Sequence, residues 1–414
     1  MGADLIFYNI GQLVTSRELE KNSGSSMENI EILENGYVAV ENGHILTFGT
    51  GKVPNNLVGL NTKLIDVEGK VLSPGLIDSH THLVHGGSRE NEFSMKISGV
   101  PYLEILKNGG GILSSVSATR EATAEELLSK AKNTLAKMLS FGVTAVESKS
   151  GYGLDLENEI KQLEVNKTLN LIQPVHIIST FMGAHATPKE FKDSPERFLD
   201  SVINMLPIIK EKELAEFCDV FCEKNIFSIP ESKELLSKAK ELGFKIKIHA
   251  DEIESLGGAE LAGELGAVSA DHIMAISEAG IQSLKENQVI GNLLPGTSFN
   301  LCKAYAPARK LIESGVEIAL STDYNPGSCP CENLQLIMQI AASQMKMTPK
   351  EVFKAVTINA AKSIGKEDTI GSIDVGKKAD FVIFDAHNID YILYHFGTSH
   401  TQSVYIGGSL VYKK

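Results

Sequence analysis

The sequence predicts an α/β fold: a TIM-like (β/α)8 barrel inserted into a small β-sandwich domain that is built from both chain termini. Three observations lead to this prediction. Apolar strand segments alternate with amphipathic helices through the middle of the chain, eight such strands can be counted before residue 330, and short strands separated by glycines occupy both ends. A chain of 414 residues has room for a barrel of about 250 residues and a smaller domain.

The two ends of the chain resemble each other more than either resembles the middle. Glycines separate apolar runs near the N-terminus, and similar runs return after residue 371 without helical spacing. The expected terminal strands cover residues 5–14, 36–48, 63–72, 380–384 and 403–412. We therefore expect residues 1–70 and 362–414 to form the composite β-sandwich domain, and residues 71–361 to form the barrel.

The middle of the chain alternates between strand and helix patterns. In residues 124–140, apolar side chains recur at helical spacing, as they do in residues 232–242 and 256–265. Apolar strands separated by such helices favour a parallel sheet that is covered on both faces, and eight repeats favour a closed barrel over an open sheet. The expected barrel strands cover residues 76–81, 143–149, 175–182, 217–222, 245–249, 267–272, 289–294 and 317–322.

Charge and composition restrict the partners of the protein. The formal net charge of −13 argues against nucleic acid, because phosphate binding needs a basic face. No run approaches about 18 uninterrupted apolar residues, so we expect no membrane segment. The five cysteines have no framework spacing and the N-terminus has no signal-peptide pattern, which together predict reduced thiols in a cytoplasmic protein.

Polar residues gather at the C-terminal ends of the expected strands. His80 and His82 are two apart on the first barrel strand, so both project from the same face. His249 closes another strand, and Asp323 follows the last one. A barrel collects such groups at one mouth, where imidazole and carboxylate ligands bind zinc or iron and leave a position for water. These four residues therefore predict a hydrolytic metal site, since a hydrogen-bonded core cluster accounts for their convergence less well.

Two further residues can move protons beside this site. His272 ends the sixth barrel strand and can act as a neutral base, whereas strand alternation points Asp271 the other way. Glu252 follows His249 by three residues and can carry a proton to a leaving nitrogen. The ordinary alternatives are a structural histidine and a solvated loop charge.

Residues in the loops beyond the strands can bind a substrate. Arg89 can bind a carboxylate through two parallel hydrogen bonds, although a single arginine in a loop is more often a surface charge. Tyr152 lies between two glycines, and His185 follows the third strand. In the last loop, Asn325 and Gly327 can present amide groups to a ligand.

The motifs resemble those of the amidohydrolase superfamily, and most closely its members that open an imidazolone ring in histidine degradation. Asp78-Ser-His-Thr-His82 alone indicates the superfamily. The closer resemblance rests on these segments in this order: Thr81-His-Leu-Val-His-Gly-Gly-Ser-Arg89, Lys149-Ser-Gly-Tyr-Gly153, Met182-Gly-Ala-His185, His249-Ala-Asp-Glu252, Ala270-Asp-His272 and Ser321-Thr-Asp-Tyr-Asn-Pro-Gly-Ser328.

The resemblance implies hydrolysis of the ring carbon–nitrogen bond of 4-imidazolone-5-propanoate to N-formimidoyl-L-glutamate by a metal-activated water. It implies one divalent or trivalent ion per subunit, zinc or iron, and a homodimer. The implied ligands are His80, His82, His249 and Asp323, and the implied substrate contacts are Arg89, Tyr152, His185, Glu252, Asn325, Gly327 and Ser328. With this substrate, we expect His272 and Asp323 to take the water proton and Glu252 to protonate the leaving nitrogen.

Other functions remain open at this point. A mononuclear-metal aminohydrolase that deaminates a purine or pyrimidine ring would use the same scaffold, but such a neutral ring offers Arg89 no carboxylate. A binuclear cyclic-amide hydrolase would need a bridging lysine on the fourth strand, whereas Lys149 lies on the second. A non-catalytic binding or assembly relative is the remote alternative, because a fold does not fix a function.

Overall fold

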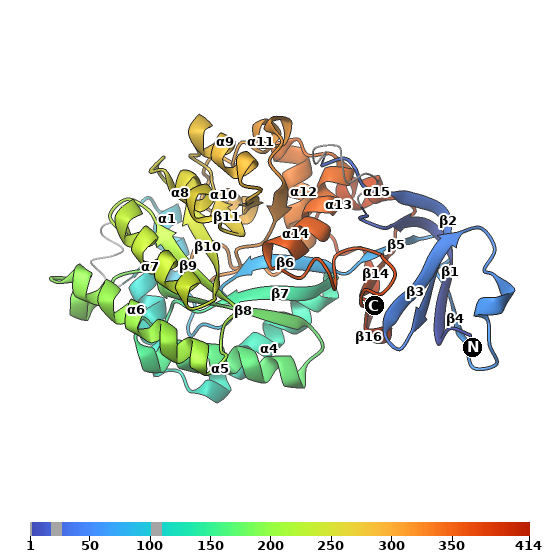
Figure 1. Cartoon of the computed structure of the whole chain (residues 1–414), viewed down its shortest axis with the longest axis horizontal. Coiled ribbons are helices and arrows are strands. Elements are labelled where there is room, and N and C mark those ends of the chain that lie inside the picture. Colours follow the sequence, from blue (N-terminus) through green and yellow to red (C-terminus); the bar gives the residue numbers. More distant parts are fainter. Residues whose placement is uncertain (1, 18–26, 101–109) are drawn as a thin grey trace.

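The computed structural model of the chain describes residues 2–17, 27–100 and 110–414. Two sheets dominate it: a parallel barrel sheet surrounded by helices and a mixed sheet to which both termini contribute (Figure 1). The fold class expected from the sequence is confirmed.

The barrel sheet has eight parallel strands, which lie side by side in the order of the sequence. The backbone N–H of His82 donates to the carbonyl of Tyr324 at 2.8 Å, and that of Asp323 donates to His80 at 3.1 Å, so the first and last strands meet. The strands are β6 Leu76–Thr81, β7 Val143–Lys149, β8 His176–Ala184, β9 Phe217–Cys222, β10 Lys245–Ala250, β11 Ser269–His272, β12 Ile290–Leu293 and β13 Ile318–Leu320.

Amphipathic helices cover the outside of the barrel. In α4, Thr123 and Glu126 form a capping box, and the apolar side chains of Leu127, Leu135 and Met138 are buried. The helices are α1 Glu90–Ile97, α3 Ile112–Glu121, α4 Ala124–Ser140, α5 Leu156–Ile172, α6 Pro195–Glu211, α7 Ile229–Glu241, α8 Gly258–Leu265, α9 Glu278–Glu286, α10 Pro295–Asn300, α11 Ala308–Ser314, α12 Leu334–Met345, α13 Pro349–Ala355, α14 Ile358–Ser363 and α15 Ile389–Tyr394, with short 3₁₀ turns at Asn55–Leu57 and Lys189–Phe191.

The second sheet joins the two ends of the chain. Its strands are β1 Leu5–Val14, β2 Ile32–Glu41, β3 His44–Thr50, β4 Lys63–Asp66, β5 Val71–Pro74, β14 Phe381–Phe384, β15 Thr401–Ile406 and β16 Ser409–Lys413. Phe7 from the N-terminal part packs edge-on against Phe381 and Tyr405 from the C-terminal part, with ring centroids 5.4 and 4.8 Å apart. The domain boundaries drawn from the sequence stay a prediction; β5 pairs with β1 and β14 in this sheet and leads into β6.

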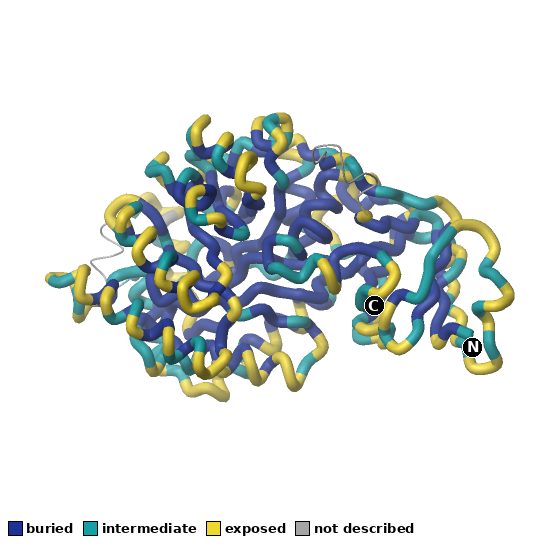
Figure 2. The backbone as a smooth tube through the Cα atoms, viewed as in Figure 1, coloured by how far each residue is buried: buried dark blue, intermediate teal, exposed yellow. Residues whose placement is uncertain are grey.

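The barrel interior is apolar at the N-terminal ends of its strands. There, Ala360 and Ala361 of α14 pack against one side chain from each of six strands: Ile77, Ala145, Ile178, Phe217, Ile290 and Ala319. Figure 2 shows the strands of the barrel as a continuous buried region. Because this plug fills one end, polar side chains can gather at the other.

Among the described residues, no helix combines the length and the apolarity that crossing a membrane requires.

Candidate metal-dependent active site

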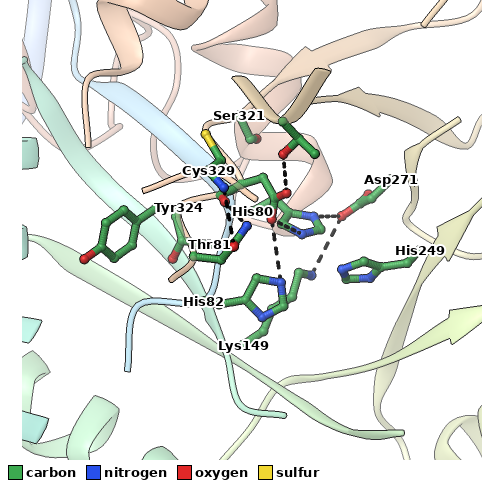
Figure 3. Close-up of polar contacts among 12 residues, drawn as sticks. His80, Thr81, His82, Lys149, His249, Asp271, Ser321, Tyr324 and Cys329 are labelled. Carbon is green, nitrogen blue, oxygen red and sulfur yellow. Dashed lines mark hydrogen bonds and ion pairs between the residues drawn. The ribbon is translucent and has the colours of Figure 1, made fainter. Parts of the chain in front are cut away.

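Three histidines converge at the C-terminal end of the barrel. His80 is the penultimate residue of β6, His82 directly follows that strand, and His249 lies near the end of β10. One ring nitrogen from each of the three lies within 4.8 Å of the others, and all three side chains are buried. Figure 3 shows their rings gathered around one centre. The structure thus brings together the three histidines that the sequence singled out.

The chemistry of these rings suits a metal ion. Burial holds the pKa of His80, His82 and His249 well below the usual value, and neighbouring histidines and Lys149 lower it further, so the rings are neutral near pH 7. Within the described part of the chain, Nε2 of His80 and Nε2 of His249 are buried without a hydrogen-bond partner. Buried nitrogen lone pairs without a donor are costly, and a cation would satisfy them.

Asp323 adds a carboxylate to the three rings. Its Oδ1 lies 3.5 Å from Nε2 of His80 and 3.7 Å from Nε2 of His82. The Thr297 hydroxyl in α10 donates to Oδ2 and orients the group. Burial raises the pKa of Asp323 to about 7. A cation beside it would favour the ionised form, as for any carboxylate near a positive charge.

Asp271 points into the barrel, which corrects the expectation from strand alternation. Its Oδ2 lies 2.5 Å from Nδ1 of His80. Burial opposes ionisation of Asp271, but Lys247 and Lys149 hold its pKa below the usual value, so Nδ1 of His80 donates and Nε2 keeps its lone pair. His272 also faces this region, since its φ of 74° ends the extended strand. The left-handed backbone is the reason that two consecutive residues both reach the site.

A buried ionic network below the histidines was missed from the sequence. It contains three carboxylates and two lysines, all fully buried: Glu147, Lys149, Asp219, Lys247 and Asp271. The detectable signal was a charged residue at inward-facing positions of otherwise apolar strands. The network surrounds Lys149 with carboxylates, so a carboxylated and hence anionic Lys149 would be electrostatically unfavourable.

Glu252 and His272 lie together beside the ligands. Oε2 of Glu252 is 3.7 Å from Nε2 of His272. Burial raises the pKa of Glu252 to about 8, helped by Asp323 and Glu223, and burial lowers the pKa of His272 to about 4. Near pH 7 the pair therefore holds one protonated acid and one neutral base. Asp251 accepts four backbone N–H groups at the start of α8 and fixes the loop that carries Glu252.

Arg89 lies against the last loop of the barrel. Its Nε donates to Glu92 at 3.0 Å, while in the described residues no hydrogen bond involves its two terminal nitrogens. A Cβ on Gly327 would lie only 2.1 Å from Nη1, so the guanidinium rests directly on the Gly327 backbone. The side chain is 13% exposed, which leaves an edge for a ligand.

Tyr152 and His185 lie beside His82. His185 stacks on His82 with ring centroids 4.8 Å apart, and Tyr152 lies 5.3 Å from His185 and 5.7 Å from His82. Glu159 in α5 accepts the backbone N–H groups of Gly151, Gly153 and Leu154, which fixes the tyrosine loop. Glu159 was not predicted from the sequence as part of the site.

Asn325 organises the loop after Asp323. Its side-chain amide donates to the carbonyl of Asp323 and to Ser328 Oγ, and its oxygen accepts from the N–H groups of Gly327 and Ser328. In this conformation, the Asn325 side chain and these backbone N–H groups form hydrogen bonds within the loop. The substrate contacts expected from Asn325, Gly327 and Ser328 therefore stay a prediction.

Comparison with known proteins gives consistent matches. A model of the amidohydrolase family matches residues 71–411. The chain is 63% identical to an imidazolonepropionase of Fusobacterium nucleatum subsp. nucleatum over 100% of both chains. It is 56% identical to an imidazolonepropionase of Alkaliphilus oremlandii over 100% of this chain and 99% of the relative.

Solved structures with lower sequence identity share the fold. An adenosine deaminase from Xanthomonas campestris with bound zinc has a TM-score of 0.73 at 20% identity, covering 99% of this chain and 93% of its own. A guanine deaminase from E. coli has a TM-score of 0.72 at 16% identity, covering 99% of both chains. At such identities the similarity speaks for the architecture alone.

Proposed function

The chain belongs to the amidohydrolase family, and from this premise we propose the reaction that its site carries out. It hydrolyses the ring carbon–nitrogen bond of 4-imidazolone-5-propanoate and releases N-formimidoyl-L-glutamate. The observation that carries the assignment is the position of Arg89, a carboxylate-binding group whose guanidinium lies against Gly327 in the loop that follows Asp323.

One metal ion, zinc or iron, is held by His80, His82, His249 and Asp323. The buried lone pairs of the histidines and the nearby carboxylate support this ligand set. When bound, such an ion polarises a carbonyl group and lowers the pKa of water. His80, Glu147 and Asp271 form a second group that could hold a metal ion, but Lys149 and Lys247 already neutralise its carboxylates. This arrangement supports a single ion.

Arg89 binds the propionate carboxylate and thereby places the ring. Its two terminal nitrogens match the two oxygens of a carboxylate, and the Gly327 backbone fixes the plane of the guanidinium. Tyr152 and His185 lie beside His82 and contact the ring. The carboxylate does not react, so its binding energy serves to orient the part that does.

Two proton transfers complete the hydrolysis. Water adds to the ring carbonyl carbon, and its proton passes to neutral His272 or to Asp323. The carbon–nitrogen bond then breaks, and protonated Glu252 supplies the proton that the departing nitrogen requires. The raised pKa of Glu252 and the lowered pKa of His272 support these roles.

The reaction is tested with freshly prepared 4-imidazolone-5-propanoate. We expect its absorbance to disappear faster than the spontaneous rate, formimidoylglutamate to accumulate, and a chelator to abolish the acceleration. The opposite result is no acceleration by fully metallated protein together with ammonia release from a purine or pyrimidine. That outcome would assign the site to ring deamination.

The rate should depend on pH through Glu252. His272, Asp323 and Glu223 are the titratable groups that face or influence this carboxyl group. Because burial raises its pKa to about 8, Glu252 is protonated below that pH and loses the proton above it. We therefore expect kcat/KM to fall about tenfold per unit above pH 8, and Glu252→Gln to lower kcat by about 10²- to 10⁴-fold and to remove this alkaline limb.

Glu254→Gln provides the matched control for Glu252. Glu254 lies in the same loop, but it is 53% exposed and pairs with Lys224. This variant should keep the rate and the pH profile of the unaltered protein. If the alkaline limb persists unchanged in Glu252→Gln, another group donates the proton.

The resemblance implied a homodimer, and the cysteines together with the N-terminal sequence predicted a cytoplasmic location. Both stay predictions, and sedimentation of the purified protein measures the first of them.

A further inference from the structure

Lys149 is a fully buried cation at the end of β7. Its Nζ lies 2.8 Å from Oε1 of Glu147, 2.7 Å from Oδ2 of Asp219 and 3.7 Å from Oδ2 of Asp271. Burial alone would lower the pKa of Lys149, but the three carboxylates raise it above the usual value, so the group stays charged. A buried charge with these partners holds its carboxylates in fixed positions.

The carboxylate oxygens that face Lys149 also face two of the histidines. Oδ2 of Asp219 lies 3.0 Å from Nδ1 of His249, a close contact without hydrogen-bond geometry, and Oδ2 of Asp271 lies 2.5 Å from Nδ1 of His80 and forms a hydrogen bond with it. A carboxylate beside Nδ1 selects the tautomer with a proton on that atom and leaves the lone pair on Nε2. In Figure 3, Lys149 and Asp271 lie beside the rings of His80 and His249.

We propose that Lys149 is a positioning residue for the metal site and acts through Asp219 on His249, with a weaker action through Asp271 on His80. This inference rests on the ligand set proposed above. Lys149 holds the two carboxylates where they fix the tautomer and the orientation of the rings.

Lys247 offers an internal comparison. It is equally buried, carries the same charge and belongs to the same network. Its Nζ contacts Glu147 at 2.9 Å, Asp271 at 3.5 Å and the carbonyl of Ser79 at 2.9 Å. Among the described residues, none of its ion pairs involves Asp219. Lys247 therefore matches Lys149 in burial and charge but lacks the connection to His249.

The test is a double-mutant cycle on metal affinity in the full chain. Metal-free protein is titrated with Zn²⁺ against a chromophoric chelator, and the absorption spectrum is recorded with Co²⁺. We expect Lys149→Met and Asp219→Asn each to weaken Zn²⁺ binding by about 10- to 100-fold and to change the Co²⁺ spectrum. The double variant should bind about as weakly as either single variant, because both changes interrupt one connection.

The control cycle combines Lys247→Met with Asp219→Asn. In this cycle the fold-losses in Zn²⁺ affinity of the two single variants should multiply in the double variant. If Lys149→Met fails to fold, the double variant replaces it, since it leaves neither partner of the pair as an unpaired buried charge. Its Zn²⁺ affinity should then equal that of Asp219→Asn alone.

Unchanged Zn²⁺ affinity and an unchanged Co²⁺ spectrum in Lys149→Met would overturn the inference while the proposed metal site stands. Losses from Lys149→Met and Asp219→Asn that multiply would also overturn it. Unaltered protein that binds no Zn²⁺ at all would contradict the metal site itself, so the two failures are distinguishable.

Discussion

Arg89→Ala should lower kcat/KM for 4-imidazolone-5-propanoate by about 10²- to 10⁴-fold. The substitution removes two charge-assisted hydrogen bonds worth about 1.5–3 kcal/mol each, and about 1.4 kcal/mol corresponds to a tenfold change. Steady-state kinetics with the propionate substrate measure the loss. An analogue in which the carboxylate is an uncharged amide provides the control, because both proteins should turn it over at similar low rates.

Gly327→Ala tests the same contact from the other side. A Cβ at this position would lie 2.1 Å from Nη1 of Arg89, so the guanidinium must move. We expect KM to rise while the circular dichroism spectrum and metal content stay unchanged. Equal kcat/KM in Arg89→Ala and the unaltered protein would show that the carboxylate binds elsewhere.

His249→Ala should remove tight metal binding and lower kcat by about 10³-fold or more. A bound metal supplies several kcal/mol of transition-state stabilisation in metal-dependent hydrolases, and His249 contributes one of the buried lone pairs that we propose as ligands. Metal analysis of the purified variant and the imidazolone assay measure the two effects together.

His176→Ala is the matched control, since His176 also lies on a barrel strand. It begins β8 and contacts Asp380 at 3.0 Å, on the opposite end of the barrel from the metal site. This variant should keep its metal and its rate. A full metal equivalent and undiminished turnover in His249→Ala would contradict the proposed ligand set.

The barrel could be predicted from the sequence because each of its strands is a short apolar run between helical patterns. The expected strand at 76–81 coincides with β6, and that at 217–222 coincides with β9. The histidine ligands could be proposed for a similar reason, because a polar side chain at the end of a buried apolar strand needs a partner there. Residues 36–48 were expected as one strand, but the turn at Asn42 and Gly43, both with positive φ, divides them into β2 and β3.

The connections among side chains could not be predicted in this way. Lys149, Asp219 and Asp271 come from three strands, and their proximity depends on how the barrel aligns those strands. Asp271 and His272 also departed from simple alternation, because the backbone turns left-handed at His272. A strand pattern gives the direction of each side chain along one strand, whereas ion pairs require the register between strands.

The first and last barrel strands meet at a seam, and the residues of the site lie on both sides of it. Asp78 of β6 accepts hydrogen bonds from Thr322, a residue 244 positions later, and the neighbouring His80 and Asp323 lie on the two sides of this seam. During synthesis, β6 leaves the ribosome long before β13, which lies next to it across the seam. The proposed ligand set is therefore complete only after the last barrel strand docks, and a cation bound there would hold the first and last barrel strands together.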